Sequence, residues 1–266
     1  MNKRFAAIFF CFVSVIGCSR QPSVQTTQID YITIDEEMSL GEMLRSAMQR
    51  RHTMIRNSRV NETVNLWADS IAAFSDWTEL DYEVFILNRK DYLHFSLPGG
   101  NIYLSRTVLE SVEHQHEIFA VLAHEIAHLG RRHAVDTIAQ LYGYAIASQR
   151  IVGENPQIAD RIVANLFHSE SILNYSKQAE FNTDLDTITF MKRAGLPGNI
   201  FVHYLQRLGE QTDLQTDIHL QTHSSFPRRR RYLQNRLDIS AHQPEKRLIS
   251  SEFKTFQTEL QEIPLY

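Results

Sequence analysis

The chain has 266 residues, of which 43% are hydrophobic and 22% are charged, and its formal net charge is −4 at pH 7. These apolar side chains are enough to bury a core, and the length fits one domain behind a short leader. The acidic balance, without a module that interleaves basic and aromatic residues, argues against nucleic acid as a partner.

The first 17 residues have the pattern of a bacterial secretion signal. Basic residues at the start precede an apolar run over residues 5–16, which is too short to cross a bilayer as a helix. Gly17 and Cys18 stand where the apolar run ends. We therefore predict a signal peptide over residues 1–17 that is removed before Cys18.

Residues 15–18 resemble a lipobox, which predicts that a lipid is attached to Cys18. The alternative is an ordinary secretory peptide in which the cysteine is incidental. Ser19 after the cysteine is typical of lipoproteins sorted to the outer membrane of Gram-negative bacteria. We therefore expect a chain held at the periplasmic face of the outer membrane through its lipid, without a spanning segment.

The polar residues 18–34 predict a flexible tether between the lipid and a single folded domain over residues 35–266. Helical patterns occupy residues 35–76, the clear strands cover residues 82–87 and 92–104, and helical spacing continues to about residue 237. We therefore predict a mainly α fold of the α+β class with a small β-sheet. Apolar side chains near the end predict a last amphipathic helix that docks on the domain through Phe253, Phe256 and Leu260.

Pro98, Gly99 and Gly100 interrupt the second strand region and predict a tight turn or bulge. An edge strand near residues 101–104 would suit a protease, because an extended substrate can add its backbone to such an edge. A plain hairpin without that role is the alternative.

Residues 124–128 read His-Glu-Ile-Ala-His within an apolar helical pattern. Two histidines four residues apart lie on one face of a helix, one turn above each other, where they can bind a single zinc ion. Glu125 follows the first histidine directly and can act as the general base of a metalloprotease. The alternative is an ordinary helix that happens to contain two histidines. A third ligand elsewhere in the sequence would favour the zinc site over this alternative.

The third ligand cannot come from the same segment by the metzincin rule, which places a glycine and a histidine at fixed offsets. Gly130 and His133 each fall one position early, and a continuing helix would point His133 away from the metal. A carboxylate from a second helix is the other source. Glu180 and Asp184 begin an amphipathic stretch four residues apart, so we predict Glu180 as the ligand. Asp184 would orient a ligand histidine or hold a nearby cation, unless both form a solvated acidic face.

HExxH followed by E-x-x-x-D about fifty residues later resembles the gluzincin family that contains HtpX-type proteases and the CAAX prenyl endopeptidase. Three more segments are similar to motifs of that family: the LPGG strand at residues 97–104, the helix at 123–133, and Thr222-His223 with Pro227 and its arginines. The resemblance covers roughly residues 35–240. It implies a zincin-like metallopeptidase fold with the small sheet next to the active-site helix.

The resemblance also implies one zinc ion per subunit, and it assigns roles to two further residues. His223 would cover the metal or stabilise the oxyanion, and Arg229 best matches an arginine of the family. Most of the arginine run at residues 228–231 is expected to be solvated surface, with one of its arginines directed toward Asp184 or the substrate carbonyl. Ser224 departs from the usual proline, and Leu93 and His94 replace an Asn-Ala pair, but neither change touches an expected metal ligand.

The sequence thus predicts a zinc-dependent metalloendopeptidase of the lipid-anchored periplasmic branch, with protein or peptide substrates. The resemblance suggests quality control of misassembled outer-membrane proteins and contact with the outer-membrane assembly machinery. A chaperone-like assembly factor that uses the protease fold mainly for binding is the alternative. A third hypothesis is a latent enzyme, in which His223 occupies the fourth zinc site or residues 153–178 cover the cleft.

Overall fold

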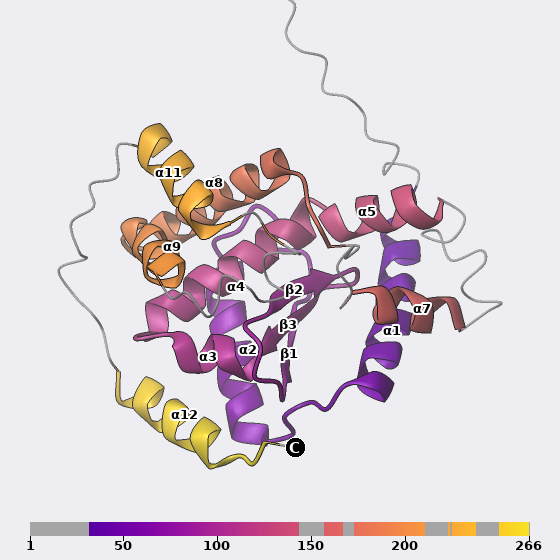
Figure 1. Cartoon of the computed structure of the whole chain (residues 1–266), viewed down its shortest axis with the longest axis horizontal. Coiled ribbons are helices and arrows are strands. Elements are labelled where there is room, and N and C mark those ends of the chain that lie inside the picture. The colour runs from indigo at the N-terminus through magenta and orange to yellow at the C-terminus, as the bar shows by residue number, and fades with distance from the viewer. Residues whose placement is uncertain are drawn as a thin grey trace, which may run out of the picture.

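Helices surround a small sheet in the computed structural model, which describes residues 32–143, 157–166, 173–210, 223, 225–237 and 250–265 (Figure 1). The predicted signal peptide, Cys18 and nearly all of the tether lie outside these residues. The helices of the described part are α1 (Ile34–Arg51), α2 (Ser58–Ala72), α3 (Arg106–Ser111), α4 (Gln115–Gly130), α5 (His133–Tyr142), α7 (Gln157–Asn165), α8 (Lys177–Arg193), α9 (Asn199–Glu210), α11 (Phe226–Leu237) and α12 (Ser251–Glu262). The predicted mainly helical fold with a small sheet is confirmed. Over the described ranges, no helix is both long enough and apolar enough to cross a membrane.

The sheet contains three strands, β1 (Glu83–Leu87), β2 (His94–Leu97) and β3 (Asn101–Ser105), in the order β1-β3-β2. β3 pairs in parallel with β1 and antiparallel with β2. The expected edge strand near residues 101–104 is therefore wrong, because β3 is the central strand. The edge that lies beside α4 is β2 (Figure 1).

The turn between β2 and β3 has the shape that its two glycines permit. Gly99 and Gly100 have φ angles of 76° and 77°, which residues with a Cβ rarely adopt. The turn also packs closely on Gly41 of α1. A Cβ at that position would lie only 2.2 Å from the carbonyl oxygen of Pro98, so a side chain does not fit there. The LPGG segment thus forms a tight hairpin that is held against the first helix.

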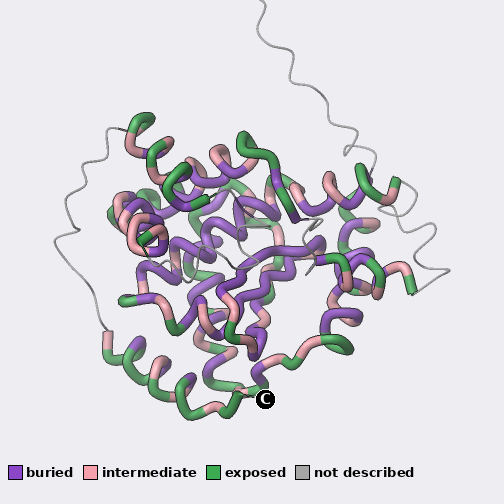
Figure 2. The backbone as a smooth tube through the Cα atoms, viewed as in Figure 1, coloured by how far each residue is buried: buried purple, intermediate pink, exposed green. Residues whose placement is uncertain are grey.

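The sheet separates two hydrophobic clusters, and side-chain alternation assigns each strand residue to one of them. On β3, Ile102 and Leu104 join the cluster around α2, α4, α8 and α9, whereas Tyr103 faces α1 and α5. On β2, Phe95 and Leu97 belong to the α1 side. His94 and Ser96 alternate with these two residues along the strand and are therefore directed to the side of α4. Figure 2 shows that the central strands and most of α4 are buried.

The last residue of α4, Gly130, has to be a glycine because the ring of Trp77 leaves no room for a side chain there. A Cβ at Gly130 would lie 1.9 Å from the ring of Trp77. Two residues later Arg132 adopts a left-handed conformation with φ of 57°, and α5 starts in a new direction at His133. The helix therefore does not continue through His133.

The predicted docking helix near the end of the chain is confirmed as α12. Its side chains Phe253, Phe256 and Leu260 are buried, and the ring of Phe256 lies 4.8 Å from that of Trp67 on α2.

A buried histidine and carboxylate cluster as the candidate metal centre

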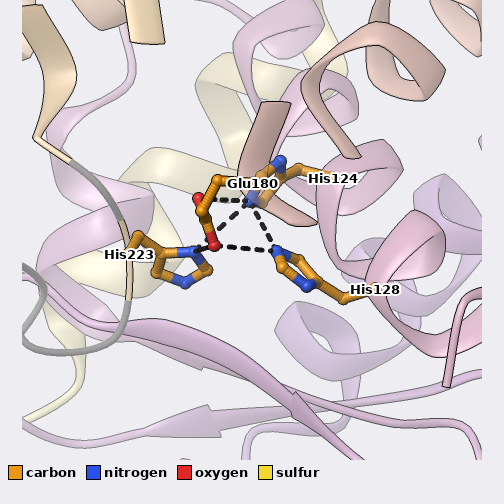
Figure 3. A group of neighbouring side chains, drawn as sticks. All are labelled: His124, His128, Glu180 and His223. Atoms are coloured by element: carbon orange, nitrogen blue, oxygen red, sulfur yellow. Dashed lines mark hydrogen bonds and ion pairs between the residues drawn. The ribbon is translucent and has the colours of Figure 1, made fainter. Parts of the chain in front are cut away.

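α4 brings the two histidines of HExxH together, side by side with Glu180 and His223 (Figure 3). The Nε2 atoms of His124 and His128 are 3.1 Å apart, and both side chains are 1% exposed or less. The spacing of four residues therefore places both imidazoles on one face, as the sequence predicted.

Two further residues complete a group that we call the metal cluster: His124, His128, Glu180 and His223. Glu180 lies on α8, which begins after Ser176 accepts a hydrogen bond from the backbone N–H of Ala179. Its Oε1 is 3.4 Å from Nε2 of His128 and 3.0 Å from Nδ1 of His223. One donor atom from each of the four residues falls within 4.8 Å of the others. Three segments distant in sequence thus converge on one point.

His133 supports this arrangement from outside the cluster. A continuing helix would point it away from the metal, but α4 ends before it. Its Nδ1 is 2.9 Å from Nδ1 of His128, because the chain turns at Arg132. Burial lowers the pKa of His133 to about 3, so its neutral ring can accept a hydrogen bond. With Nδ1–H of His128 as the donor, Nε2 of His128 keeps its lone pair for the cluster.

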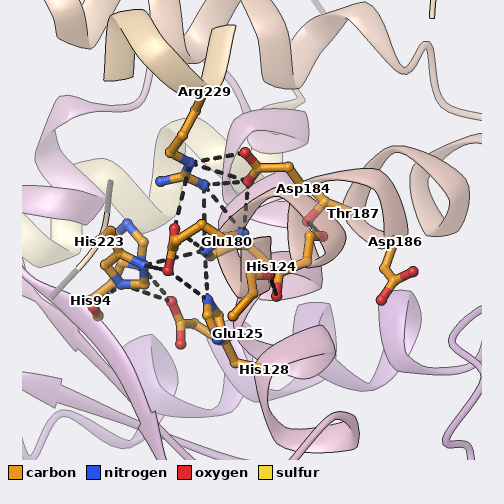
Figure 4. A network of polar contacts seen from close by, with 12 residues as sticks. His94, His124, Glu125, His128, Glu180, Asp184, Asp186, Thr187, His223 and Arg229 are labelled. Atoms are coloured by element: carbon orange, nitrogen blue, oxygen red, sulfur yellow. Dashed lines mark hydrogen bonds and ion pairs between the residues drawn. The ribbon is translucent and has the colours of Figure 1, made fainter. Parts of the chain in front are cut away.

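Asp184 and Arg229 hold His124 in the corresponding way (Figure 4). Nδ1 of His124 is 3.3 Å from Oδ1 of Asp184, which leaves Nε2 directed at the cluster. Nη2 of Arg229 donates to the same Asp184 oxygen at 2.6 Å, and both side chains are 1% exposed or less. Although burial alone would lower the pKa of Arg229, Asp184 and Glu180 raise it, so the arginine stays charged. Its neighbours Arg228 and Arg231 are exposed.

Glu125 projects beside the metal cluster toward β2. Its Oε1 is 2.5 Å from Nδ1 of His94, and its Oε2 has no hydrogen-bond partner among the described residues. Burial would raise the pKa of Glu125, but the hydrogen bond from His94 and the nearby imidazoles lower it. The carboxylate is therefore ionised, with one oxygen held and the other unsatisfied.

The protonation states of His124 and Glu180 suit a cation, whereas in the metal-free protein Glu180 and Glu125 outweigh burial and raise the pKa of His223. Burial and the nearby Arg229 hold the pKa of His124 well below its usual value, so its ring is neutral. Burial opposes ionisation of Glu180, but His223 and Arg229 outweigh it and hold the pKa of Glu180 well below the ordinary range. Neutral imidazoles and an ionised carboxylate are the forms in which these groups bind metals.

The donor set also fits zinc in chemical type. Zinc in proteins takes histidine nitrogen and carboxylate oxygen, and catalytic sites use three protein ligands. Oε2 of Glu180 is fully buried and has no hydrogen-bond partner within the described ranges. A buried carboxylate oxygen without a donor is costly unless a cation satisfies it.

Three residues near the cluster were not assigned a role from the sequence. His94 departs from a residue pair of the family, and its alternation with Phe95 and Leu97 directs it toward α4. Tyr175 stacks on His128 with ring centroids 4.4 Å apart, just before the residue that caps α8. The contact of His133 with His128 depends on the end of α4 at Gly130, which the helical pattern of the sequence does not reveal.

The proposed cover over residues 153–178 lies partly outside the described residues, as does Ser224. Within the described part, α7 packs on α1, where Arg50 and Asp160 form an ion pair of 3.0 Å. Tyr175 is the residue of this segment that contacts the metal cluster. The hypothesis of a cover stays a prediction.

Comparison with known proteins agrees with the geometry. The model of peptidase family M48 matches residues 55–237. The beta-barrel assembly-enhancing protease of Yersinia pestis is 20% identical over 200 residues, which are 72% of this chain and 41% of the relative. A putative protein of the same name from Vibrio cholerae is 23% identical over 71% of this chain and 41% of its own length. A mitochondrial metalloendopeptidase of Arabidopsis thaliana is 24% identical over 61% of this chain and 33% of its own length. The chain thus spans about two-fifths or less of these relatives.

Proposed function

The chain belongs to peptidase family M48, and from this premise we propose that it is a zinc-dependent metalloendopeptidase. The observation that carries the proposal is the convergence of His124, His128 and Glu180 beside a partly unsatisfied Glu125. The donor types fit zinc, and the family match covers every one of these positions.

In this proposal His124, His128 and Glu180 hold the ion. Bound zinc would act as a Lewis acid, which would polarise the scissile carbonyl and lower the pKa of water to about 7. Glu125 takes a proton from water through its unsatisfied Oε2 and returns it to the leaving amine. Asp184 orients His124, and Arg229 neutralises Asp184 so that the buried carboxylate does not compete for the ion.

His223 has two proposed roles, which its contacts support differently. Its Nε2 lies 3.1 Å from the backbone carbonyl of His94, which turns Nδ1 toward Glu180 and His124. This geometry fits a fourth ligand that keeps the enzyme latent, whereas stabilisation of an oxyanion requires His223 to face the substrate. A digest with His223→Ala distinguishes the roles, because removal of a cover raises activity and removal of an oxyanion donor lowers it.

For location and substrates, we propose a lipid-anchored protein at the periplasmic face of the outer membrane that cleaves periplasmic or misassembled outer-membrane proteins. The lipobox pattern at residues 15–18 supports the anchor on Cys18. Relatives from two Gram-negative bacteria carry the name beta-barrel assembly-enhancing protease, which supports contact with outer-membrane assembly. A chaperone-like assembly factor that mainly binds such proteins is the second candidate.

The test combines zinc analysis with a casein digest of the wild type beside Glu125→Gln. We expect one zinc per chain in both proteins and a loss of about 10²- to 10⁴-fold in cleavage for the variant, the usual contribution of a general base. Substantial cleavage by Glu125→Gln would show that another group is the base. Zinc without cleavage in the wild type would favour the binding factor.

A further inference from the structure

His94 occupies the edge strand β2 at the point where the strand passes Glu125. The residue is 3% exposed, and its Nδ1 lies 2.5 Å from Oε1 of Glu125 (Figure 4). Ser96, two residues along, is directed to the same side of the sheet, but its Oγ has no hydrogen-bond partner in the described part of the chain. The contact with Glu125 is thus specific to the side chain at position 94.

The direction of the hydrogen bond follows from the chemistry of the two groups. An ionised carboxylate only accepts hydrogen bonds, so Nδ1 of His94 carries the proton and donates it to Oε1. Burial lowers the pKa of His94 to about 4, despite the opposing effect of Glu125, so the ring is a neutral donor at neutral pH. A hydrogen bond with one ionised partner is stronger than one between neutral groups.

The ring of His94 is held in place by its own neighbours. Tyr92 meets it edge-on with ring centroids 5.8 Å apart, and the hydroxyl of Tyr92 lies 2.5 Å from that of Tyr204 on α9. The ring of His223 lies against the other side at 4.7 Å, and its Nε2 donates to the backbone carbonyl of His94. A donor fixed by packing can orient its partner before substrate arrives.

We propose that His94 is a positioning residue for the general base. Its Nδ1–H holds Oε1 of Glu125, so that Oε2 is the carboxylate oxygen that takes the proton from water. This inference rests on the proposed peptidase function and on Glu125 as the base. It explains why a buried carboxylate in the site has one oxygen with a donor and one without.

The kinetic test compares His94→Ala, His94→Asn and the matched control Ser96→Ala, all loaded with zinc. We expect kcat of His94→Ala to fall about 10- to 100-fold with KM unchanged, because the loss of one hydrogen bond to a charged group is about 1.5–3 kcal/mol. His94→Asn should recover most of the loss, since its amide nitrogen lies about where Nδ1 does. Ser96→Ala should match the wild type, and all four proteins should bind one zinc.

A second measurement uses the metal-free protein, so it does not depend on activity. In a proton NMR spectrum with nitrogen-labelled histidine, the Nδ1–H of His94 should give a resonance at low field. It should be absent in His94→Ala and move to higher field in Glu125→Gln, whose amide is a weaker acceptor.

The outcomes separate this inference from the proposed function. If the zinc-loaded wild type does not cleave casein, the proposed function fails while the NMR measurement still tests the contact. An active wild type with unchanged kcat in His94→Ala would overturn the positioning role alone. So would a loss of zinc in His94→Ala, which would make His94 a ligand, or equal losses in the Ala and Asn variants.

Discussion

The two ends of α4 carry the same kinds of residue but differ in what those residues can do. At the start of the helix, the amino-terminal cluster consists of His114, His116 and Glu117, all buried. One carboxylate oxygen of Glu117 accepts hydrogen bonds from the backbone N–H of Glu113 at 2.7 Å and from Arg207 at 2.5 Å. At the other end, Oε2 of both Glu125 and Glu180 lacks a hydrogen-bond donor within the described residues.

This difference shows that two histidines and a glutamate do not by themselves make a metal site. The amino-terminal cluster draws its histidines and carboxylate from one segment, and an arginine from α9 already neutralises the carboxylate. The metal cluster draws donors from α4, α8 and His223, and all of them converge within 4.8 Å. Glu117 is thus held by donors of the protein itself, whereas Oε2 of Glu125 and of Glu180 has no hydrogen-bond donor among the described residues.

The comparison predicts its largest effect for the two carboxylates. Glu180→Ala should weaken zinc binding by more than about 100-fold, since loss of a group outside the ligand shell already costs about 10- to 100-fold. Glu117→Gln should bind zinc like the wild type. Zinc titration by calorimetry measures both, and normal affinity in Glu180→Ala would point to another ligand.

A smaller effect is expected for the two arginines, one at each end. Arg229→Ala leaves Asp184 buried without its partner, which should cost about 3–5 kcal/mol of unfolding free energy. The side chain of Arg207 is 21% exposed, and Glu117 keeps its backbone donor, so Arg207→Ala should cost roughly 1–3 kcal/mol.

Urea melts of the metal-free proteins measure both losses. Equal losses in the two variants would contradict the distinction between the two ends. If Arg229→Ala does not fold, the double variant Arg229→Met with Asp184→Asn should regain folding, because neither residue then buries a charge alone.

The residues that the sequence selects as metal ligands lie together in the structure, and the signals that select them are mainly local. The spacing of His124 and His128, and of Glu180 and Asp184, follows from helix geometry alone, and these positions also agreed with family motifs. The sequence predicts that one arginine of residues 228–231 faces Asp184 or the substrate carbonyl, and the structure places Arg229 against Asp184. Each of these predictions needed only the helix period and the order of motifs along the chain.

The errors arose where contacts between distant segments decide the structure. The edge of the sheet depends on β1 pairing with β3, which no pattern within either strand reveals. His133 contacts His128 because the chain turns at Arg132, next to the point where Trp77, more than fifty residues away in the chain, packs on Gly130. The contact of His94 with Glu125 likewise depends on the packing of β2 against α4, which the sequence of β2 alone does not reveal.

The smallest predicted effect concerns acid and the amino-terminal cluster. Burial and the neighbouring His114 lower the pKa of His116, and the positive end of the α4 dipole acts in the same direction. As pH falls below about 6.5, the unfolded chain therefore takes up a proton at His116 before the folded protein does. The stabilisation that the lowered pKa of His116 gives the folded protein is therefore fully present above about pH 6.5 and decreases as the pH falls below it.

His116→Gln should remove this contribution, so its melting temperature should fall less than that of the parent between about pH 7.5 and about pH 5. The comparison is best made in the Glu180→Ala background, because zinc is itself released as histidines and carboxylates take up protons. Parallel pH curves for the two proteins would mean that His116 is protonated equally in the folded and unfolded states. A flatter curve for His116→Gln would show that a buried histidine at this end of α4 contributes to stability through its protonation alone, without a metal ion.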